Sequence, residues 1–188
     1  CLFYLFSPLN PALALEQDCT SKYFDESATV KYVHDGDTVK LLDGRKIRLI
    51  GINAPELARD GREAESYALT ARDLLKTLLS KHTNHVQLVH GVESKDHYQR
   101  LLSHLFLPDG TNLQAQLLSA GLANSISIPP NERFSSCYQQ VEKKALCEKN
   151  GLWQDPKPAI AYLQNHASAV PELKGKILSI KTARRSQW

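Results

Sequence analysis

Alternating apolar and polar residues mark the first part of the chain as a series of short strands. Residues 28–33, 38–42 and 46–52 each follow this alternation and are rich in β-branched side chains, which is typical of strands with one buried face. Asp35-Gly36 and Asp43-Gly44 stand between these runs and are typical turn dipeptides. The pattern therefore predicts three strands joined by tight turns.

A helical period replaces the alternation after Gly61. Apolar residues at spacings of three and four predict a long helix over about 64–79, with one face made of Ala64, Tyr67, Ala68, Ala71, Leu74, Leu75, Leu78 and Leu79. Two further strands are predicted at 86–92 and 100–107. A short helix over 113–120 ends at Gly121, and a last helix over about 132–149 directs inward Phe134, Tyr138, Val141 and Ala145.

This order of elements favours an α+β fold, a five-stranded OB-type β-barrel with three helices. Closing five short strands into a barrel is one way in which an antiparallel sheet removes its exposed edges. We expect the barrel domain to span 28–154, preceded by an N-terminal arm at 15–27. Residues 155–188 read as a proline-containing linker and a basic tail, in which 174–181 resemble the first strand of a truncated second domain.

Charge is distributed unevenly along the 188 residues. Residues 15–154 hold 17 Lys and Arg against 18 Asp and Glu, whereas residues 155–188 hold 6 against 2. A protein that binds nucleic acid only through non-specific phosphate contacts would spread positive charge over its body. The composition therefore argues against a pure binding module.

The first fourteen residues predict export. They are apolar and end in Ala12-Leu13-Ala14, which has the small-x-small form of a signal-peptidase site. We interpret them as the remnant of a secretory signal rather than as a hydrophobic N-terminal strand or a lipid-modified Cys1. The stretch is too short to span a bilayer, so we expect a secreted or periplasmic protein without a membrane span.

Export would allow disulfide bonds, and three cysteines lie beyond the signal remnant. Cys137 and Cys147 are ten positions apart on a predicted helix, about 15 Å by helical rise, which exceeds disulfide reach. Cys19 is therefore the partner of one of them if a bridge exists. Because Cys137 borders the apolar face of the last helix, through Val141, we expect the pair Cys19–Cys137.

Four short segments carry candidate chemistry: residues 35–38, Arg48, residues 53–56 and residues 96–100. Each alone has an ordinary structural interpretation, such as a hairpin turn or a strand-end ion pair. Together they place two polar clusters at strand ends and supply oxygen ligands for a hard cation, two guanidinium groups and a spare carboxylate. Phosphodiester hydrolysis needs those parts. We interpret His90 and His104 as strand-face residues, and the pair His82 and His85 lacks partners for a metal site.

These segments resemble the staphylococcal-type thermonucleases over about 28–154. The resemblance rests on Val33-His34-Asp35-Gly36-Asp37-Thr38-Val39, on Arg48-Leu49-Ile50-Gly51-Ile52-Asn53-Ala54-Pro55-Glu56, on Asp96-His97-Tyr98-Gln99-Arg100 and on Gly151-Leu152-Trp153. The family fold is an OB barrel with three helices, which agrees with the predicted order of elements.

The resemblance implies a role for each matching position. Asp37 and the Ala54 carbonyl match calcium ligands, and Asp35 matches a carboxylate behind them. Glu56 matches the carboxylate that activates water, and Arg48 and Arg100 match the arginines that grip the phosphate. Tyr98 matches a tyrosine near a phosphate of the bound nucleotide. The resemblance implies Ca²⁺ as cofactor and DNA and RNA as substrates.

The chain departs from the family pattern at several positions. Asn53 stands where a second Asp ligand is usual, and His97 stands where the type member has Lys, at the substrate-binding edge. The loop after Glu56 is short, and the positions near Ser127 and Pro129 are not tyrosines. We expect a monomeric secreted nuclease with no stable protein partner. The alternative is a non-catalytic OB-fold module that binds nucleic acid or protein.

Overall fold

A closed five-stranded barrel forms the centre of the molecule. The computed structural model describes residues 19–59 and 61–155, so the predicted signal remnant, the linker and the basic tail lie outside the described residues. The barrel strands are β1 (Glu26–Val33), β2 (Thr38–Leu41), β3 (Lys46–Leu49), β5 (His85–Lys95) and β6 (Leu101–Phe106). They neighbour one another in the order β1-β2-β3-β6-β5. β3 and β6 run parallel, and the other pairs are antiparallel.

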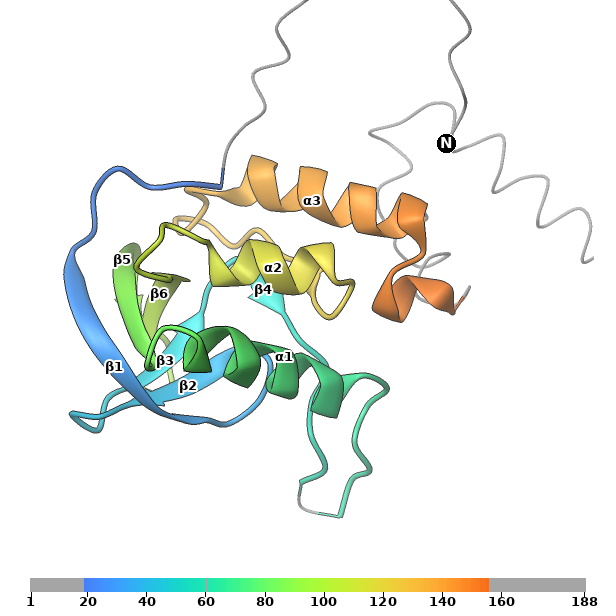
Figure 1. The fold of residues 1–188 in the computed structure, drawn as a ribbon, viewed down its shortest axis with the longest axis horizontal. Coiled ribbons are helices and arrows are strands. Elements are labelled where there is room, and N and C mark those ends of the chain that lie inside the picture. Colours follow the sequence, from blue (N-terminus) through green and yellow to red (C-terminus); the bar gives the residue numbers. More distant parts are fainter. Residues whose placement is uncertain (1–18, 60, 156–188) are drawn as a thin grey trace, which may run out of the picture.

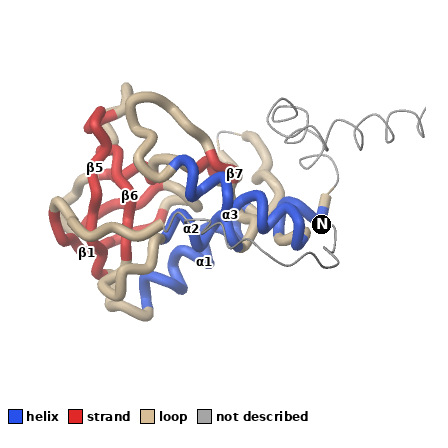
Figure 2. Tube along the Cα trace, turned by 90° about the horizontal axis from the view of Figure 1, so that it is seen from above, coloured by secondary structure: helices blue, strands red, loops and turns tan. Residues whose placement is uncertain are grey.

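Three helices cover the barrel, which confirms the predicted fold class. They are α1 (Ala68–Ser80), α2 (Leu113–Ser119) and α3 (Ser135–Glu148), and a 3₁₀ turn, Gly151–Gln154, follows them. Figure 1 shows α2 between α3 and the barrel strands, and Figure 2 shows the helices gathered to one side of the strands. In the described part of the chain, no helix is long and apolar enough to cross a membrane.

The first helix begins four residues later than the apolar spacing predicts. Residues 56–59 and 61–65 form the two arms of a projecting hairpin instead, in which the backbones of Arg59 and Arg62 bond each other, with N–O distances of 3.2 and 2.9 Å. The hairpin is closed at its base by Glu65, whose backbone N–H donates to the Glu56 carbonyl at 2.9 Å. Ala64 is exposed, so its place in the helical period is coincidental.

The predicted third strand is divided by Gly51. Its φ of 84° is left-handed, and a Cβ there would lie 2.5 Å from the Tyr138 ring, so only glycine fits both the turn and the packing. Beyond the turn, β4 (Ile52–Asn53) pairs with β7 (Asn124–Ser125), a small sheet that the hydrophobic pattern did not predict. The buried Glu142 carboxylate on α3 accepts a hydrogen bond from the Ser125 backbone N–H at 2.9 Å.

A disulfide joins Cys19 to Cys137, with Cα atoms 5.6 Å apart, as predicted. Cys147 is exposed and lies outside this bond. The bridge holds the start of the described chain against α3. Aromatic rings continue the core from there, because Phe24 contacts Phe106, and Phe106 contacts Phe134.

His104 lies on a strand, β6, as interpreted, and its side chain is buried. It is 2% exposed, and its Nδ1 lies 2.8 Å from the Tyr138 hydroxyl. Burial lowers the pKa of His104 to about 3, because a charged imidazolium is poorly solvated in the core. His104 is therefore neutral in the folded protein across the physiological range.

This burial predicts acid sensitivity. The folded pKa of about 3 lies below the ordinary histidine pKa of 6.5, so between these values the unfolded chain binds a proton that the folded protein does not bind. The free energy of unfolding should fall by up to about 2 kcal/mol from pH 7 to pH 5 through this group alone. Urea unfolding of the wild type and of His104→Gln at both pH values isolates the contribution. The exposed His85→Gln serves as control. If the free energy of unfolding falls equally between pH 7 and pH 5 in the wild type and in His104→Gln, the prediction is contradicted.

Candidate active site

The candidate site is organised by Asp37, a carboxylate buried at the turn between β1 and β2. It is 4% exposed. Its Oδ2 accepts a hydrogen bond from the Ala54 backbone N–H at 2.9 Å and lies 3.1 Å from an Arg48 guanidinium nitrogen. Its Oδ1 accepts from the Thr38 hydroxyl at 3.0 Å. Asp37 thus connects the strand end at 37–38 to the segment that follows β4.

Gly36 allows this turn to press against its neighbours. A Cβ at this position would lie 2.6 Å from the Ala54 Cβ and 2.8 Å from the Ala71 Cβ on α1. The glycine is therefore needed for close approach, and any side chain would push Asp37 away from Ala54. The neighbouring Asp35 turns back on the loop, because its Oδ1 accepts from the Asp37 backbone N–H at 3.0 Å.

The electrostatics of Asp37 are unfavourable without a further positive charge. Burial raises its pKa to about 6, and the nearby Asp35 raises it too, whereas Arg48 and the bonds from Ala54 and Thr38 lower it. A carboxylate that loses its hydration holds its charge poorly unless cations compensate it. One guanidinium does not fully compensate two adjacent carboxylates.

Arg48 is held rigidly beside this carboxylate. One of its terminal nitrogens donates to the carbonyls of Leu49 and Ile52, the latter at 3.0 Å, and the other donates to the Asn53 side-chain oxygen at 3.2 Å. The side chain is 14% exposed. These contacts fix the guanidinium plane at the strand end, and the ion pair with Asp37 keeps its charge local.

Arg100 approaches from the other side of Thr38. Its Nε donates to Asp96 at 2.7 Å, and a terminal nitrogen lies 3.4 Å from the Thr38 hydroxyl. Although partial burial raises the pKa of Asp96, hydrogen bonds from Arg100 lower it overall. The guanidinium also lies over the Tyr98 ring, 5.3 Å from its centroid. Thr38 therefore lies between the Asp37 pair and Arg100.

A groove of about 930 Å³ opens over these groups. Its lining includes Asp35, Thr38, Glu56, Tyr98 and Arg100. Glu56 is exposed, and its backbone N–H donates to the Glu65 carboxylate at 3.0 Å. The groove thus presents a guanidinium and a carboxylate to one solvent-accessible space. Asp37 and Arg48 are not among its lining residues; Thr38, which lines it, donates a hydrogen bond to the buried Asp37.

The residues present fit a hard cation with few charged ligands. Calcium is bound by oxygen atoms, and carboxylates contribute most to its affinity. Asp37 supplies a buried carboxylate that lacks full compensation, and the Ala54 carbonyl and the Asn53 amide supply neutral oxygens. Among residues 19–59 and 61–155, no group of three or more His, Cys, Asp or Glu side chains is placed to hold a metal. The residue types present therefore suit calcium, while their arrangement brings few charged ligands together.

The structure brings most of the predicted site residues together. Contacts join Asp35, Asp37, Arg48, Asn53 and Ala54, and the groove joins Asp35 to Glu56, Tyr98 and Arg100. His97 is different: it is exposed, its ring lies 3.7 Å from that of Tyr98, and it is absent from the groove lining.

Three side chains received no role from the sequence, although they position the site. Thr38 and Asp96 lie within the candidate segments 35–38 and 96–100. Their closeness in sequence to Asp37 and Arg100 was the feature that could have indicated a supporting role. Glu65 bonds the backbone of Glu56 from nine residues away. The hairpin brings Glu65 to Glu56, and no local sequence pattern predicts this contact.

Comparison with known proteins places this arrangement in one family. A family model described as Staphylococcal nuclease homologue matches residues 46–155. The chain is 32% identical over 132 residues to a thermonuclease of Staphylococcus intermedius, covering 69% of this chain and 77% of that protein. It is 30% identical over 145 residues to an uncharacterized endonuclease of Escherichia coli O157:H7, covering 76% and 86%. It is 32% identical over 140 residues to endonuclease YhcR of Bacillus subtilis, covering 69% of this chain and 11% of that protein.

Proposed function

Because the chain belongs to the staphylococcal nuclease family, we propose that it is a secreted, calcium-dependent endonuclease that hydrolyses phosphodiester bonds of DNA and RNA. The observation that carries this proposal is the groove that Arg100 and Glu56 line together with Thr38, whose hydroxyl bonds the buried Asp37. The recognised unit is the phosphodiester itself, which DNA and RNA share. Arginine binds phosphate oxygens in a planar, bidentate way.

The proposed chemistry is the attack of water on a phosphate held in this groove. Glu56 accepts a proton from the water as the new phosphorus–oxygen bond forms, and the bond to the leaving oxygen breaks. Arg48 and Arg100 stabilise the charge that develops on the phosphoryl oxygens. Asp96 and Thr38 hold Arg100 in place, so the groove needs little rearrangement during the reaction.

Calcium would be held by Asp37, the Ala54 carbonyl and Asn53, with Asp35 behind them. When bound, it would add positive charge next to the phosphoryl oxygens. This set has only two carboxylates, so we expect weak binding of the kind that suits the millimolar calcium outside cells. The Cys19–Cys137 disulfide supports the same location, because such bonds persist in oxidising compartments.

Cleavage assays test the proposal directly. The purified chain should nick supercoiled plasmid and degrade a labelled RNA when calcium is present, and a chelator in excess should stop both reactions. A protein that binds these nucleic acids with calcium but leaves them uncut would establish the non-catalytic alternative. A protein that neither binds nor cuts would contradict both functions.

Glu56→Gln should lower the turnover number by about 10²–10⁴. Glutamine keeps the size of the side chain and its reach into the groove but does not accept the proton. The measurement is the cleavage rate of a fluorogenic oligonucleotide at saturating calcium, with the exposed Glu93→Gln as matched control. Wild-type turnover in Glu56→Gln would remove the residue from the mechanism.

Arg100→Lys and Arg48→Lys should each lose most of the cleavage activity while the fold is retained. A lysine ammonium keeps the charge but does not make the paired contacts of a guanidinium. Steady-state kinetics measures the loss of cleavage activity in each variant, and thermal unfolding shows whether the fold is retained. Arg45→Lys, whose guanidinium pairs with Glu26 and Asp43 outside the groove, is the control. Normal cleavage by Arg100→Lys would show that this residue is purely structural.

Asn53→Asp should tighten calcium binding about tenfold, which corresponds to about 1.4 kcal/mol. The substitution adds a negative charge at the same reach, and affinity for calcium follows the number of charged oxygen ligands. Calorimetric titration with calcium measures the affinity directly, and the calcium concentration for half-maximal cleavage measures it in action. An affinity unchanged from wild type would mean that residue 53 does not contact the ion.

A further inference from the structure

The groove extends past the catalytic groups toward a row of cations. Its lining continues from Glu56 to His34, Lys46, Arg59 and Arg62. None of these four has a role in the mechanism above. His34 directly follows β1, Lys46 begins β3, and the two arginines belong to the hairpin between Glu56 and Glu65. The groove is therefore longer than one phosphate requires.

Strand register places Lys46 in one row with Lys40 and Tyr32. Arg48 pairs with Thr38, and Lys46 pairs with Lys40, which in turn pairs with Tyr32. The intervening residues Ile47 and Val39 are buried in the barrel. Because side chains alternate across a strand, Tyr32, Lys40 and Lys46 form one outward row, two residues along from the row that holds Arg48. Two residues of strand correspond to about 7 Å.

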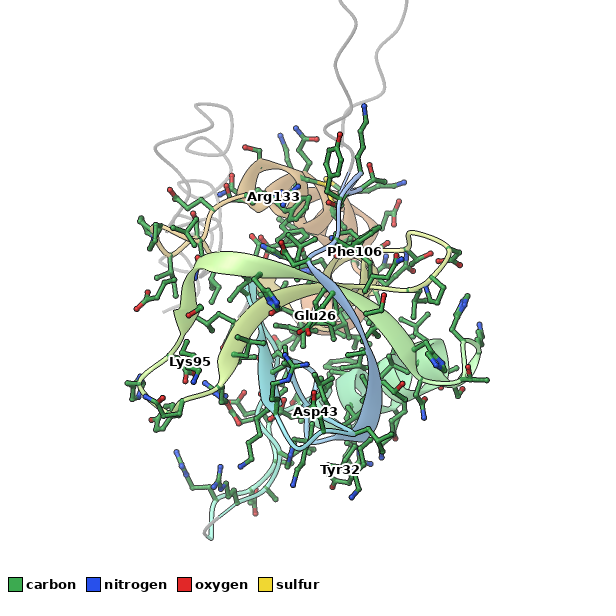
Figure 3. All side chains as sticks on the ribbon, turned by 90° about the vertical axis from the view of Figure 1, so that its left-hand side faces the viewer. Glu26, Tyr32, Asp43, Lys95, Phe106 and Arg133 are labelled. Atoms are coloured by element: carbon green, nitrogen blue, oxygen red, sulfur yellow. A yellow bond between two sulfur atoms is a disulfide. The ribbon has the colours of Figure 1, made fainter. Side chains whose placement is uncertain are left out.

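An exposed tyrosine ends this row; it does not line the groove itself but contacts His34, which does. Tyr32 is 52% exposed, and its ring lies edge-on against His34 with centroids 4.8 Å apart. Figure 3 shows Tyr32 at the rim of the barrel, at the end from which the 56–65 hairpin projects. Partial burial and Lys46 lower the pKa of His34, against the opposite influence of Asp35. The Nε2 atom of this imidazole is buried and has no hydrogen-bond partner.

We propose that Lys46, Arg62 and the Tyr32–His34 pair form a second nucleotide subsite, which binds the phosphate and base next to the bond that is cut. This inference rests on the proposed function and specifies its substrate as a single strand that runs from Tyr98, past Glu56, to Tyr32. Cations that track the backbone, combined with aromatic rings that stack bases, are the means by which proteins bind single strands.

The groove lining is balanced in charge. Lys46, Arg59, Arg62 and Arg100 face Asp35, Glu56, Glu63 and Glu65. The subsite therefore rests on Lys46 and Arg62 as individual phosphate contacts and not on an excess of positive charge.

Binding of a fluorescein-labelled dT12 tests the subsite by anisotropy, in full-length protein with calcium and with Glu56→Gln in every variant to prevent cleavage. The measured quantity is the slope of log affinity against log salt. Lys46→Gln/Arg62→Gln should make this slope shallower by about 1.4, since each phosphate contact on a single strand contributes about 0.7. Lys143→Gln/Lys144→Gln on α3 removes the same charge from a distant face and should leave the slope unchanged.

Tyr32→Ala should weaken dT12 binding about fivefold or more, and Tyr32→Phe should restore it, because stacking needs the ring and not the hydroxyl. Equal slopes for both double variants, together with normal binding by Tyr32→Ala, would overturn the second subsite and leave the proposed function standing. Absence of any dT12 binding in the Glu56→Gln protein would overturn the subsite and the proposed function together.

Discussion

The buried carboxylate of Asp37 is the interaction on which the rest of the site depends. It bonds the Ala54 backbone, receives the Thr38 hydroxyl and pairs with Arg48, so it holds the β1–β2 turn, the end of β3 and the segment after β4 together. Burial raises its pKa to about 6, which means that the fold accepts an unfavourable charge at this point. Such strain is typical of functional sites, and a bound cation would relieve it.

The hydrophobic pattern predicted the barrel, the three helices and the Cys19–Cys137 bridge because each depends on local periodicity or on one buried face. It did not predict β7 or the late start of α1. Two-residue strands carry too short a pattern, and Ala64 matched the helical period while the 56–65 hairpin used other contacts. His104 was placed on a strand, but its buried hydrogen-bond partner, Tyr138, lies far away in the chain.

The candidate site likewise contains residues that the sequence predicted and residues that it did not. Motifs identified Asp37, Arg48 and Arg100, whose side chains are fixed by neighbours in their own segments or across one strand pair. The supporting residues Glu65 and Glu142 act through hairpin closure and through the small β4–β7 sheet, which only the tertiary structure reveals. Asn53 lies on that sheet and bonds Arg48, so its departure from the family pattern changes a position that connects the proposed calcium ligands to Arg48.

A crystal structure with calcium and a phosphorothioate oligonucleotide tests the central claim most directly. The account predicts one calcium ion that contacts Asp37 and the Ala54 carbonyl, with a phosphate between Arg48 and Arg100 and Glu56 facing it. Calcium bound elsewhere, or an oligonucleotide seated on another face while Asp37 keeps only its contacts to Arg48, Thr38 and Ala54, would contradict it.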